Sequence, residues 1–505
     1  MNTSRISRSI SSQSRSAHFA FTALLFLGFV SLSTALDAAF PAELELGKLN
    51  GQTGITILAD VGARFGVSVG AVEDVNGDGL SDLLIGSQSS TRNYVIFGGL
   101  ERPEPTLNIT DIDGTNGISI QGSPASSLSG VRDFNEDGLG DVLLGYTAGL
   151  LISPGRAFLI FGSDAGLPHP FDLSKLNGVN GVEFRASGYQ HVGDGVSWAG
   201  DFNGDGASDI VIGAPAAHID DFNTGAAYLL FGGGNRSPHP FDLSSVDGEN
   251  GIIVLGESGD RLGASVAYAG DFNGDGLDDV LFADDIGGRK YLLYGSKDPI
   301  PNPFLVTDLN GSNGFIIEGR STNSVGMGSA GDFNDDGIDD LIIGDHGNAY
   351  IVFGTRNEMP NPLTLASFSE KFGIKIASES GHGSFGSAVS AAGDMNHDGI
   401  GDVVIGESGW TTDSKGKSYV IFGSRRNFAF PFSVAVLDGN NGFVALGEEE
   451  GERSGSAISH AGDFNQDGID DIVIGAPSPF VSNGDKAYVV FGRPRHRLFE
   501  DRFER

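Results

Sequence analysis

One nine-residue acidic block recurs seven times in this chain, and no other feature restricts its fold as strongly. The block reads Asp-x-Asn-x-Asp-Gly-x-x-Asp, and successive copies start 59 to 70 residues apart. The copies begin at Asp74, Asp133, Asp201, Asp271, Asp332, Asp394 and Asp463. Seven tandem copies in a chain of 505 residues indicate a repeat architecture, because a single hydrophobic core rarely grows to that size.

The same short apolar segments surround every block, as the third copy illustrates. Residues 195–200 lead into the block and Ile210–Gly213 follows it, while Ala226–Gly232 and Ile252–Leu255 complete the unit. These segments are short, β-branched or aromatic, and bounded by Gly, Asn and Pro, which is typical of strands. The 78 glycines suit a fold with many turns. Four strands in about 60 residues predict one propeller blade per unit.

Two glycine motifs flank the blocks. Phe65-Gly66 and Phe385-Gly386 precede their blocks, and Gly213-Ala214-Pro215 and Gly475-Ala476-Pro477 follow theirs. These motifs resemble the FG-GAP repeat of integrin alpha subunits, and the resemblance extends over about residues 43–492. It implies an all-β, seven-bladed β-propeller with calcium in the loop between the first two strands of a blade. Several units depart from the pattern, and the second lacks a clear Phe-Gly.

The phase of the repeat predicts how the ring closes. The first apolar segment, Ile55–Leu58, has the pattern of an outer strand, whereas the last unit ends with a third strand at Ala487–Gly492. We therefore expect the N-terminal strand to complete the seventh blade. Pairing of the N- and C-terminal strands would close a ring of four-stranded blades and leave no exposed edge.

Each block has the side chains of a calcium loop. Oxygens at positions 1, 3, 5 and 9 and a backbone carbonyl at position 7 can surround one hard cation, and glycine at position 6 permits the sharp turn. The predicted ligands are Asp74, Asn76, Asp78, Leu80, Asp82, Asp133, Asn135, Asp137, Leu139, Asp141, Asp201, Asn203, Asp205, Ala207, Asp209, Asp271, Asn273, Asp275, Leu277, Asp279, Asp332, Asn334, Asp336, Ile338, Asp340, Asp394, Asn396, Asp398, Ile400, Asp402, Asp463, Asn465, Asp467, Ile469 and Asp471. We expect up to seven Ca²⁺ ions, with dissociation constants on the order of 10⁻⁴ M.

A helical calcium motif is the alternative for such a block. An EF-hand needs a Glu at position 12 and flanking helices. Position 12 holds Ile85, Leu144, Ile212, Phe282, Ile343, Ile405 and Ile474. These apolar strand residues exclude the EF-hand. Calcium then either regulates ligand binding or holds a tight hairpin of mutually repelling carboxylates, and the structural role is the simpler interpretation.

Residues 1–35 have a different composition from the rest of the chain. Three arginines and no acidic residue precede an apolar run, Phe19–Val30, and the small residues Ser33-Thr34-Ala35. This pattern predicts a secretory signal peptide, and hence a secreted, extracellular or cell-surface protein whose mature chain has no integral membrane span.

The charge balance restricts the partners. The formal net charge is −35, and removal of the three signal-peptide arginines leaves −38, which argues against nucleic acid as a partner. The chain has no cysteine, so disulfides and thiol chemistry are excluded. Residues 493–505 contain five arginines and are predicted to form a basic, disordered tail.

Gly66–Gly70 matches the Gly-x-Ser-x-Gly pattern of a hydrolase nucleophile elbow. The equivalents of Ser68 in the other units are small residues that suit a crowded inner strand, and no strand-to-helix turn is expected there. We interpret the match as a coincidence and predict that the protein is not an enzyme. The alternative is an extracellular hydrolase or lyase that cleaves polysaccharide or phospholipid over the propeller channel. Convergent carboxylates or a histidine in the channel would favour that alternative.

The most variable loops are expected on the face opposite the calcium loops. They carry Tyr189, His191, His218, Phe222, Trp410 and Phe480. The resemblance to integrins implies that this face binds ligand, and exposed aromatics suit protein or carbohydrate contacts. We therefore predict a monomeric adhesion or ligand-binding module for an extracellular protein or carbohydrate. The acidic run Glu448–Glu452, near the same rim, is interpreted as a solvated surface.

Overall fold

The computed structural model describes residues 40–494, except for 61, 100–103, 126, 148–153, 220–221, 234–237, 285, 321–325, 346, 380–383, 410–413, 427 and 479–483. The chain divides into two units, Met1–Ala38 and Ala39–Arg505, and all described residues belong to the second. The predicted signal peptide and residues 495–505 of the predicted tail lie outside the described residues. Within the described part, no helix is long and apolar enough to cross a membrane.

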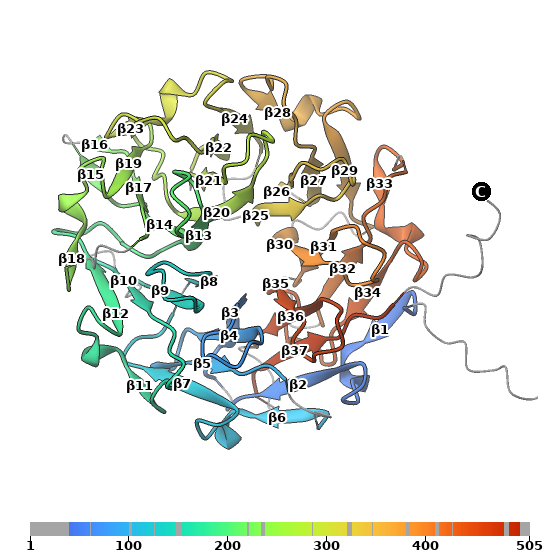
Figure 1. Ribbon diagram of the computed structural model, residues 1–505. Coiled ribbons are helices and arrows are strands. Elements are labelled where there is room, and N and C mark those ends of the chain that lie inside the picture. The colour runs from blue at the N-terminus through green and yellow to red at the C-terminus, as the bar shows by residue number, and fades with distance from the viewer. Residues whose placement is uncertain are drawn as a thin grey trace, which may run out of the picture. The chain divides into compact units, whose positions relative to one another are not determined.

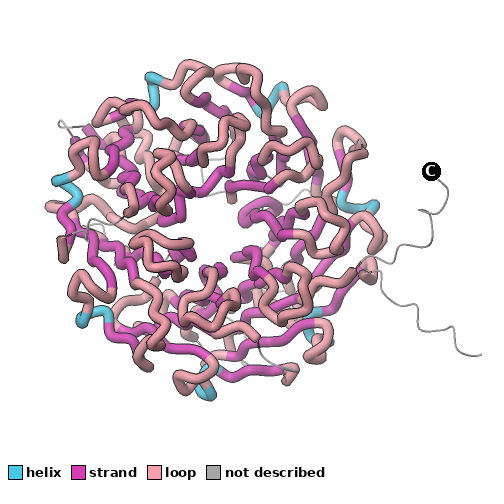
Figure 2. Tube along the Cα trace, viewed as in Figure 1, coloured by secondary structure: helices cyan, strands magenta, loops and turns pink. Residues whose placement is uncertain are grey.

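The second unit is a seven-bladed β-propeller, as the repeat predicts (Figure 1). In each blade four antiparallel strands lie side by side, with the first strand at the centre of the ring and the fourth near the rim, as in blade 3. Short 3₁₀ helices lie near the rim and precede the fourth strands (Figure 2). They are η1 (Leu46–Lys48), η2 (Ile109–Asp111), η3 (Leu173–Lys175), η4 (Leu243–Ser245), η5 (Val306–Asp308), η6 (Leu365–Ser367) and η7 (Val434–Val436).

The first four blades follow one another along the chain. Blade 1 contains β3 (Phe65–Val72), β4 (Asp82–Ser87), β5 (Arg92–Ile96), β7 (Gly117–Gln121) and β11 (Phe171–Asp172). Blade 2 contains β8 (Ser127–Val131), β9 (Asp141–Tyr146), β10 (Arg156–Ile160), β12 (Gly181–Arg185) and β18 (Phe241–Asp242). Blade 3 contains β13 (Val196–Gly200), β14 (Asp209–Ala214), β17 (Ala226–Leu230), β19 (Gly251–Leu255) and β23 (Phe304–Leu305). Blade 4 contains β20 (Ser265–Gly270), β21 (Asp279–Ala283), β22 (Arg289–Leu293), β24 (Gly314–Glu318) and β28 (Leu363–Thr364).

The last three blades complete the ring. Blade 5 contains β25 (Met327–Gly331), β26 (Asp340–Asp345), β27 (Asn348–Val352), β29 (Gly373–Ala377) and β33 (Phe432–Ser433). Blade 6 contains β30 (Phe385–Gly393), β31 (Asp402–Glu407), β32 (Lys417–Ile421), β34 (Gly442–Leu446) and β1 (Glu43–Glu45). Blade 7 contains β35 (Ala457–Gly462), β36 (Asp471–Ala476), β37 (Lys486–Val490), β2 (Gly54–Leu58) and β6 (Thr106–Asn108). A small hairpin, β15 (His218–Ile219) and β16 (Phe222–Asn223), extends from blade 3.

The prediction of four-stranded blades was one strand short. Each sheet has a fifth strand of two or three residues that runs parallel to the fourth. In blade 1, for example, Phe171–Asp172 comes from the linker of blade 2 and pairs with Ile120 and Gln121. Two residues cannot show the alternation that identifies a strand, so the sequence pattern missed them. The added strand covers the outer edge of each sheet.

The predicted closure of the ring is confirmed. β2 is the fourth strand of blade 7 and pairs antiparallel with β37, with Gly54 opposite Val490 and Leu58 opposite Lys486. β1 adds the fifth strand of blade 6. Arg493, the first residue of the predicted tail, belongs to the propeller, because its guanidinium lies 5.3 Å from the ring centre of Phe40.

The hydrophobic core lies between neighbouring blades. The described residues form seven clusters of buried apolar side chains, one at each blade interface. The backbones approach closely where the two glycine motifs meet. A Cβ on Gly475 of blade 7 would lie 2.0 Å from the carbonyl oxygen of Gly66 in blade 1, and one on Gly406, at the equivalent position of blade 6, would lie 2.2 Å from that of Gly455 in blade 7. Each motif therefore supplies one half of a contact between blades.

Candidate functional site

The seven acidic blocks form the loops that join the inner strand of each blade to its second strand. The aspartate at position 1 holds the turn. In blade 1, Asp74 Oδ1 accepts the N–H of Gly77 (2.6 Å) and Asp78 (2.9 Å), and its Oδ2 accepts the N–H of Gly79 (2.7 Å). The Asn76 amide donates to Asp78 at 2.9 Å. Positions 1, 3 and 5 therefore share one compact turn.

The aspartate at position 9 ties each loop to the end of its third strand. Its carboxylate accepts the N–H of the glycine that follows an aromatic residue after that strand, over 2.8 to 3.0 Å in all seven blades. In six blades its other oxygen also accepts the N–H of position 2. Sequence reasoning assigned these aspartates only to metal binding. The signal it overlooked is the aromatic-Gly pair that ends every third strand.

Burial changes the acidity of these aspartates. It raises the pKa of Asp82 to about 7 and the pKa of Asp209, Asp340 and Asp471 to about 8, although backbone N–H donors oppose the rise. Neighbouring loop aspartates raise these pKa values further. A carboxylate ionised in this position therefore needs a positive charge nearby.

The loops are also bonded to one another around the ring. The carbonyl at position 2 of each loop accepts an N–H from the residue after the aromatic-Gly pair of the next blade. Val75 accepts from Ser163 at 2.9 Å, Phe333 from Ser424 at 3.0 Å, and Phe464 from Gly99 at 2.9 Å, which crosses the closure of the ring. Each loop is thus held by its own blade and by the next one.

The donor set of the loops fits a hard cation. Four buried oxygens at predicted ligand positions have no hydrogen-bond partner: Asp201 Oδ1, Asn334 Oδ1, Asp340 Oδ2 and Asn396 Oδ1. Buried acceptors are rarely left unpaired, and calcium prefers such oxygens. Across the described ranges, no three His, Cys, Asp or Glu side chains are gathered as a ready-made metal centre.

The residues predicted to bind ligand are only partly brought together. Tyr189 is 59% exposed, and His191 has a left-handed backbone with φ of 55°. Their loop contacts the loop that leads to His218, because Ala216 donates its N–H to the Gln190 carbonyl at 3.1 Å. Phe222 lies in β16. Trp410 and Phe480 lie outside the described residues.

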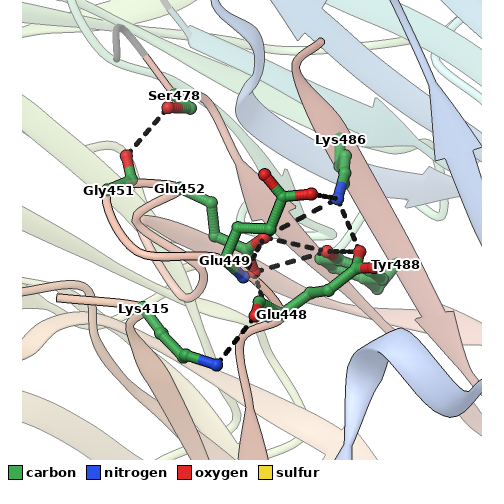
Figure 3. A network of polar contacts seen from close by, with 8 residues as sticks. All are labelled: Lys415, Glu448, Glu449, Gly451, Glu452, Ser478, Lys486 and Tyr488. Carbon is green, nitrogen blue, oxygen red and sulfur yellow. Dashed lines mark hydrogen bonds and ion pairs between the residues drawn. The ribbon is translucent and has the colours of Figure 1, made fainter. Parts of the chain in front are cut away.

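The acidic run Glu448–Glu452 is not simply a solvated surface (Figure 3). Lys486 is 5% exposed and pairs with Glu448 at 2.5 Å and Glu449 at 3.3 Å. Glu452 is 2% exposed and accepts the N–H of Glu448 and the hydroxyl of Tyr488. The sequence interpretation holds for the exposed Glu448 and Glu450 but was wrong for Glu452, which is buried, and it missed the ion pairs with Lys486, which is distant in the sequence.

A cavity of about 340 Å³ lies at the end of the central channel nearest the acidic loops. Inner-strand residues of blades 1, 2, 3 and 7 line it, and their strands surround the central opening in Figure 1. Glu73 pairs with Arg132 at 2.8 Å, and His460 with Asp470 at 3.2 Å. The hydrogen bond from His460 lowers the pKa of Asp470. Sequence reasoning missed this cavity because its residues come from different blades.

An aromatic stack continues the wall of this cavity. Trp198 of blade 3 stacks on Tyr268 of blade 4 with ring centres 4.3 Å apart, and the Arg132 guanidinium lies 4.9 Å from the Trp198 ring. Tyr268 in turn donates its hydroxyl to Asp278 at 2.9 Å. The row Glu73, Arg132, Trp198, Tyr268 and Asp278 therefore follows the channel rim across four blades.

Comparison with known proteins identifies one repeat family and two kinds of relative. The FG-GAP repeat matches residues 65–98, 192–230, 385–421 and 454–490. Phosphatidylinositol-glycan-specific phospholipase D of Bos taurus is 26% identical over 384 residues, which cover 68% of this chain and 42% of the relative. Integrin alpha pat-2 of Caenorhabditis elegans is 30% identical over 236 residues, which cover 43% of this chain and 18% of the relative.

The matched part thus spans less than half of either relative. The crystal structure of the V. cholerae biofilm matrix protein Bap1 aligns over 91% of each chain at 11% identity, but its TM-score of 0.26 supports no argument.

Proposed function

Because this chain is an FG-GAP-repeat β-propeller, we propose that it is a secreted calcium-binding propeller that acts as an adhesion or ligand-binding module. The single observation that carries the proposal is the set of four buried, unpartnered oxygens at predicted ligand positions in the third, fifth and sixth acidic loops. In each loop, the side chains at positions 1, 3, 5 and 9 and the carbonyl at position 7 would hold one Ca²⁺ ion. The bound ion supplies positive charge to clustered carboxylates.

Calcium has a structural task in this proposal. The acidic loops connect the inner strand, the third strand and the next blade through hydrogen bonds. Ions that neutralise the loops would therefore stabilise the ring as a whole. A rigid ring then presents binding residues at its faces and channel, and similarity to an integrin alpha chain supports such a role outside the cell.

Metal counting and thermal unfolding test the calcium assignment. The full chain, purified from an expression host that exports it, is measured in millimolar calcium and after chelation. We expect about seven bound ions by native mass spectrometry and a lower Tm after chelation. A protein that binds no calcium and has the same Tm in both conditions would disprove the assignment.

A capture experiment tests the binding function. Calcium-loaded protein is applied to an array of extracellular matrix proteins and to a glycan array, with chelated protein beside it. Binding to a defined ligand supports the module, and no binding on either array contradicts it.

An extracellular enzyme is the second candidate. Its support is the similarity to a phosphatidylinositol-glycan-specific phospholipase D and the three carboxylates and one histidine at the channel cavity. Two of these carboxylates, Glu73 and Asp470, are already engaged with Arg132 and His460, which suits binding better than proton transfer. Incubation with a glycosylphosphatidylinositol-anchored protein and with soluble polysaccharides tests the enzyme. Product formation that is lost in His460→Gln would establish it.

A further inference from the structure

We propose that the channel mouth at the acidic-loop end of the propeller binds a neutral saccharide residue. The inference rests on the proposed function, and it gives the binding module a ligand class and a place. The cavity of about 340 Å³ is in the size range of small-molecule sites. The inner strands β3, β8, β13 and β35 of four blades shape it, so a rigid ring positions its walls.

The polar groups of the cavity suit sugar hydroxyls. The carboxylates of Glu73 and Asp470 accept hydrogen bonds, whereas the Arg132 guanidinium donates them, and His460 presents an imidazole. These side chains remain 35% to 61% exposed, so a ligand can reach them. Their partners hold them in place at 2.8 and 3.2 Å, and this reduces the entropy lost on binding.

The apolar groups suit the carbon faces of a sugar ring. Ala71 and Trp198 contribute partly exposed apolar atoms to the same lining, whereas Val72 and Val131 belong to the core and are 3% and 1% exposed. Trp198 is fixed by its stack on Tyr268 and by Arg132, so it forms a rigid part of the wall. A ring with hydroxyls at its edge and C–H groups on its faces matches a wall that combines both kinds of surface.

The charges disfavour an anionic ligand. Glu73 and Asp470 pair with Arg132 and His460, and Asp463 of a neighbouring acidic loop adds a third carboxylate to the cavity. No excess of positive charge is therefore available for an anionic group. The net charge of −35 over the chain also repels acidic polymers.

Saturation-transfer-difference NMR on the full chain in millimolar calcium tests the inference. The probes are the methyl glycosides of glucose, galactose, mannose and N-acetylglucosamine, each titrated to about 10 mM so that a dissociation constant in the millimolar range is detected. Arg132→Gln and His460→Gln remove one donor each, and Glu73→Gln is a third variant. Arg289→Gln is the matched control, because it removes an arginine–glutamate pair with Glu257 at 3.1 Å away from the cavity.

We expect at least one glycoside to bind, and binding to weaken about tenfold or more in the channel variants but not in Arg289→Gln. The calcium count and Tm of each variant are measured first to verify folding. Binding that persists in all three channel variants would overturn the inference, and so would the absence of saturation transfer to any glycoside. In either case, capture of an extracellular protein by calcium-loaded protein would still support the proposed function.

Discussion

The backbone N–H of Gly354 donates to the buried Asp340 carboxylate at 2.8 Å and so joins the end of β27 to the acidic loop of the same blade. The next residue, Thr355, donates its N–H to the Phe272 carbonyl of the preceding loop at 2.9 Å. One aromatic-Gly-x tripeptide thus binds two loops. Because the arrangement recurs in every blade, the acidic loops form a continuous bonded ring rather than seven separate turns.

The close packing around Gly354 predicts that a side chain at this position destabilises the protein. A Cβ at Gly354 would lie 2.3 Å from the Asp339 carbonyl oxygen, whereas one at Gly328 in the same blade would lie 3.8 Å from the Tyr268 carbonyl oxygen. We expect Gly354→Ala to lower the free energy of unfolding by about 3 kcal/mol or more, because backbone must move. Gly328→Ala is the control and should change it by less than about 1 kcal/mol. Equal effects in urea unfolding would show that the contact is unimportant.

The buried, unpartnered amide of Asn396 predicts that this side chain binds the calcium ion of its own loop. Its side chain is 1% exposed, and neither its Oδ1 nor its Nδ2 has a hydrogen-bond partner. We expect Asn396→Ala to reduce the calcium count by one and to reduce the gain in Tm on calcium addition. In chelated protein the same change should be close to neutral, because it removes an unsatisfied polar group. An unchanged calcium count by native mass spectrometry would contradict this role.

The ion pairs of the buried Lys486 predict that removal of its charge lowers the free energy of unfolding. Its ammonium group faces Glu448 and Glu449, with Glu452 at 3.9 Å. Lys486→Met leaves acidic groups without their cation, so we expect a loss of about 3 kcal/mol in the free energy of unfolding. Lys48→Met removes a pair in which both side chains are more than half exposed and should cost less than about 1 kcal/mol. Similar losses for both variants would refute the assignment.

The raised pKa of Asp284 predicts that the stability of the protein depends on pH. Burial, together with Asp260, raises its pKa from 3.8 to about 6 in the folded protein, although backbone N–H groups oppose the rise. The folded state therefore binds more protons than the unfolded state between about pH 4 and 6, and stability falls as pH rises through this window.

Asp284→Asn removes the titration. We expect the variant to gain stability relative to the parent protein as the pH rises from about 4 to 7, measured by urea unfolding. Asp298→Asn, at an exposed position, is the control for the removal of one carboxylate. A constant difference for Asp284→Asn would contradict the raised pKa.

The sequence alone was sufficient for the number of blades, the position of the acidic loops and the closure of the ring. Each of these depends on residue types that recur at a regular spacing. The seven blocks from Asp74 to Asp471 count the blades, and the unpaired first segment, Ile55–Leu58, shows which blade it must complete. Repetition supplied seven observations of one pattern, so a single irregular unit did not obscure it.

Only the tertiary structure decided which side chains meet across the repeat. The fifth strands are two or three residues long, the Lys486 that pairs with Glu448 lies 38 residues away, and the channel cavity combines residues of four blades. Local periodicity records which face of a strand is apolar, but it does not record which distant strand covers that face. The ring brings equivalent positions of different blades to one axis, so the few residues that differ from blade to blade create the chemistry of the channel.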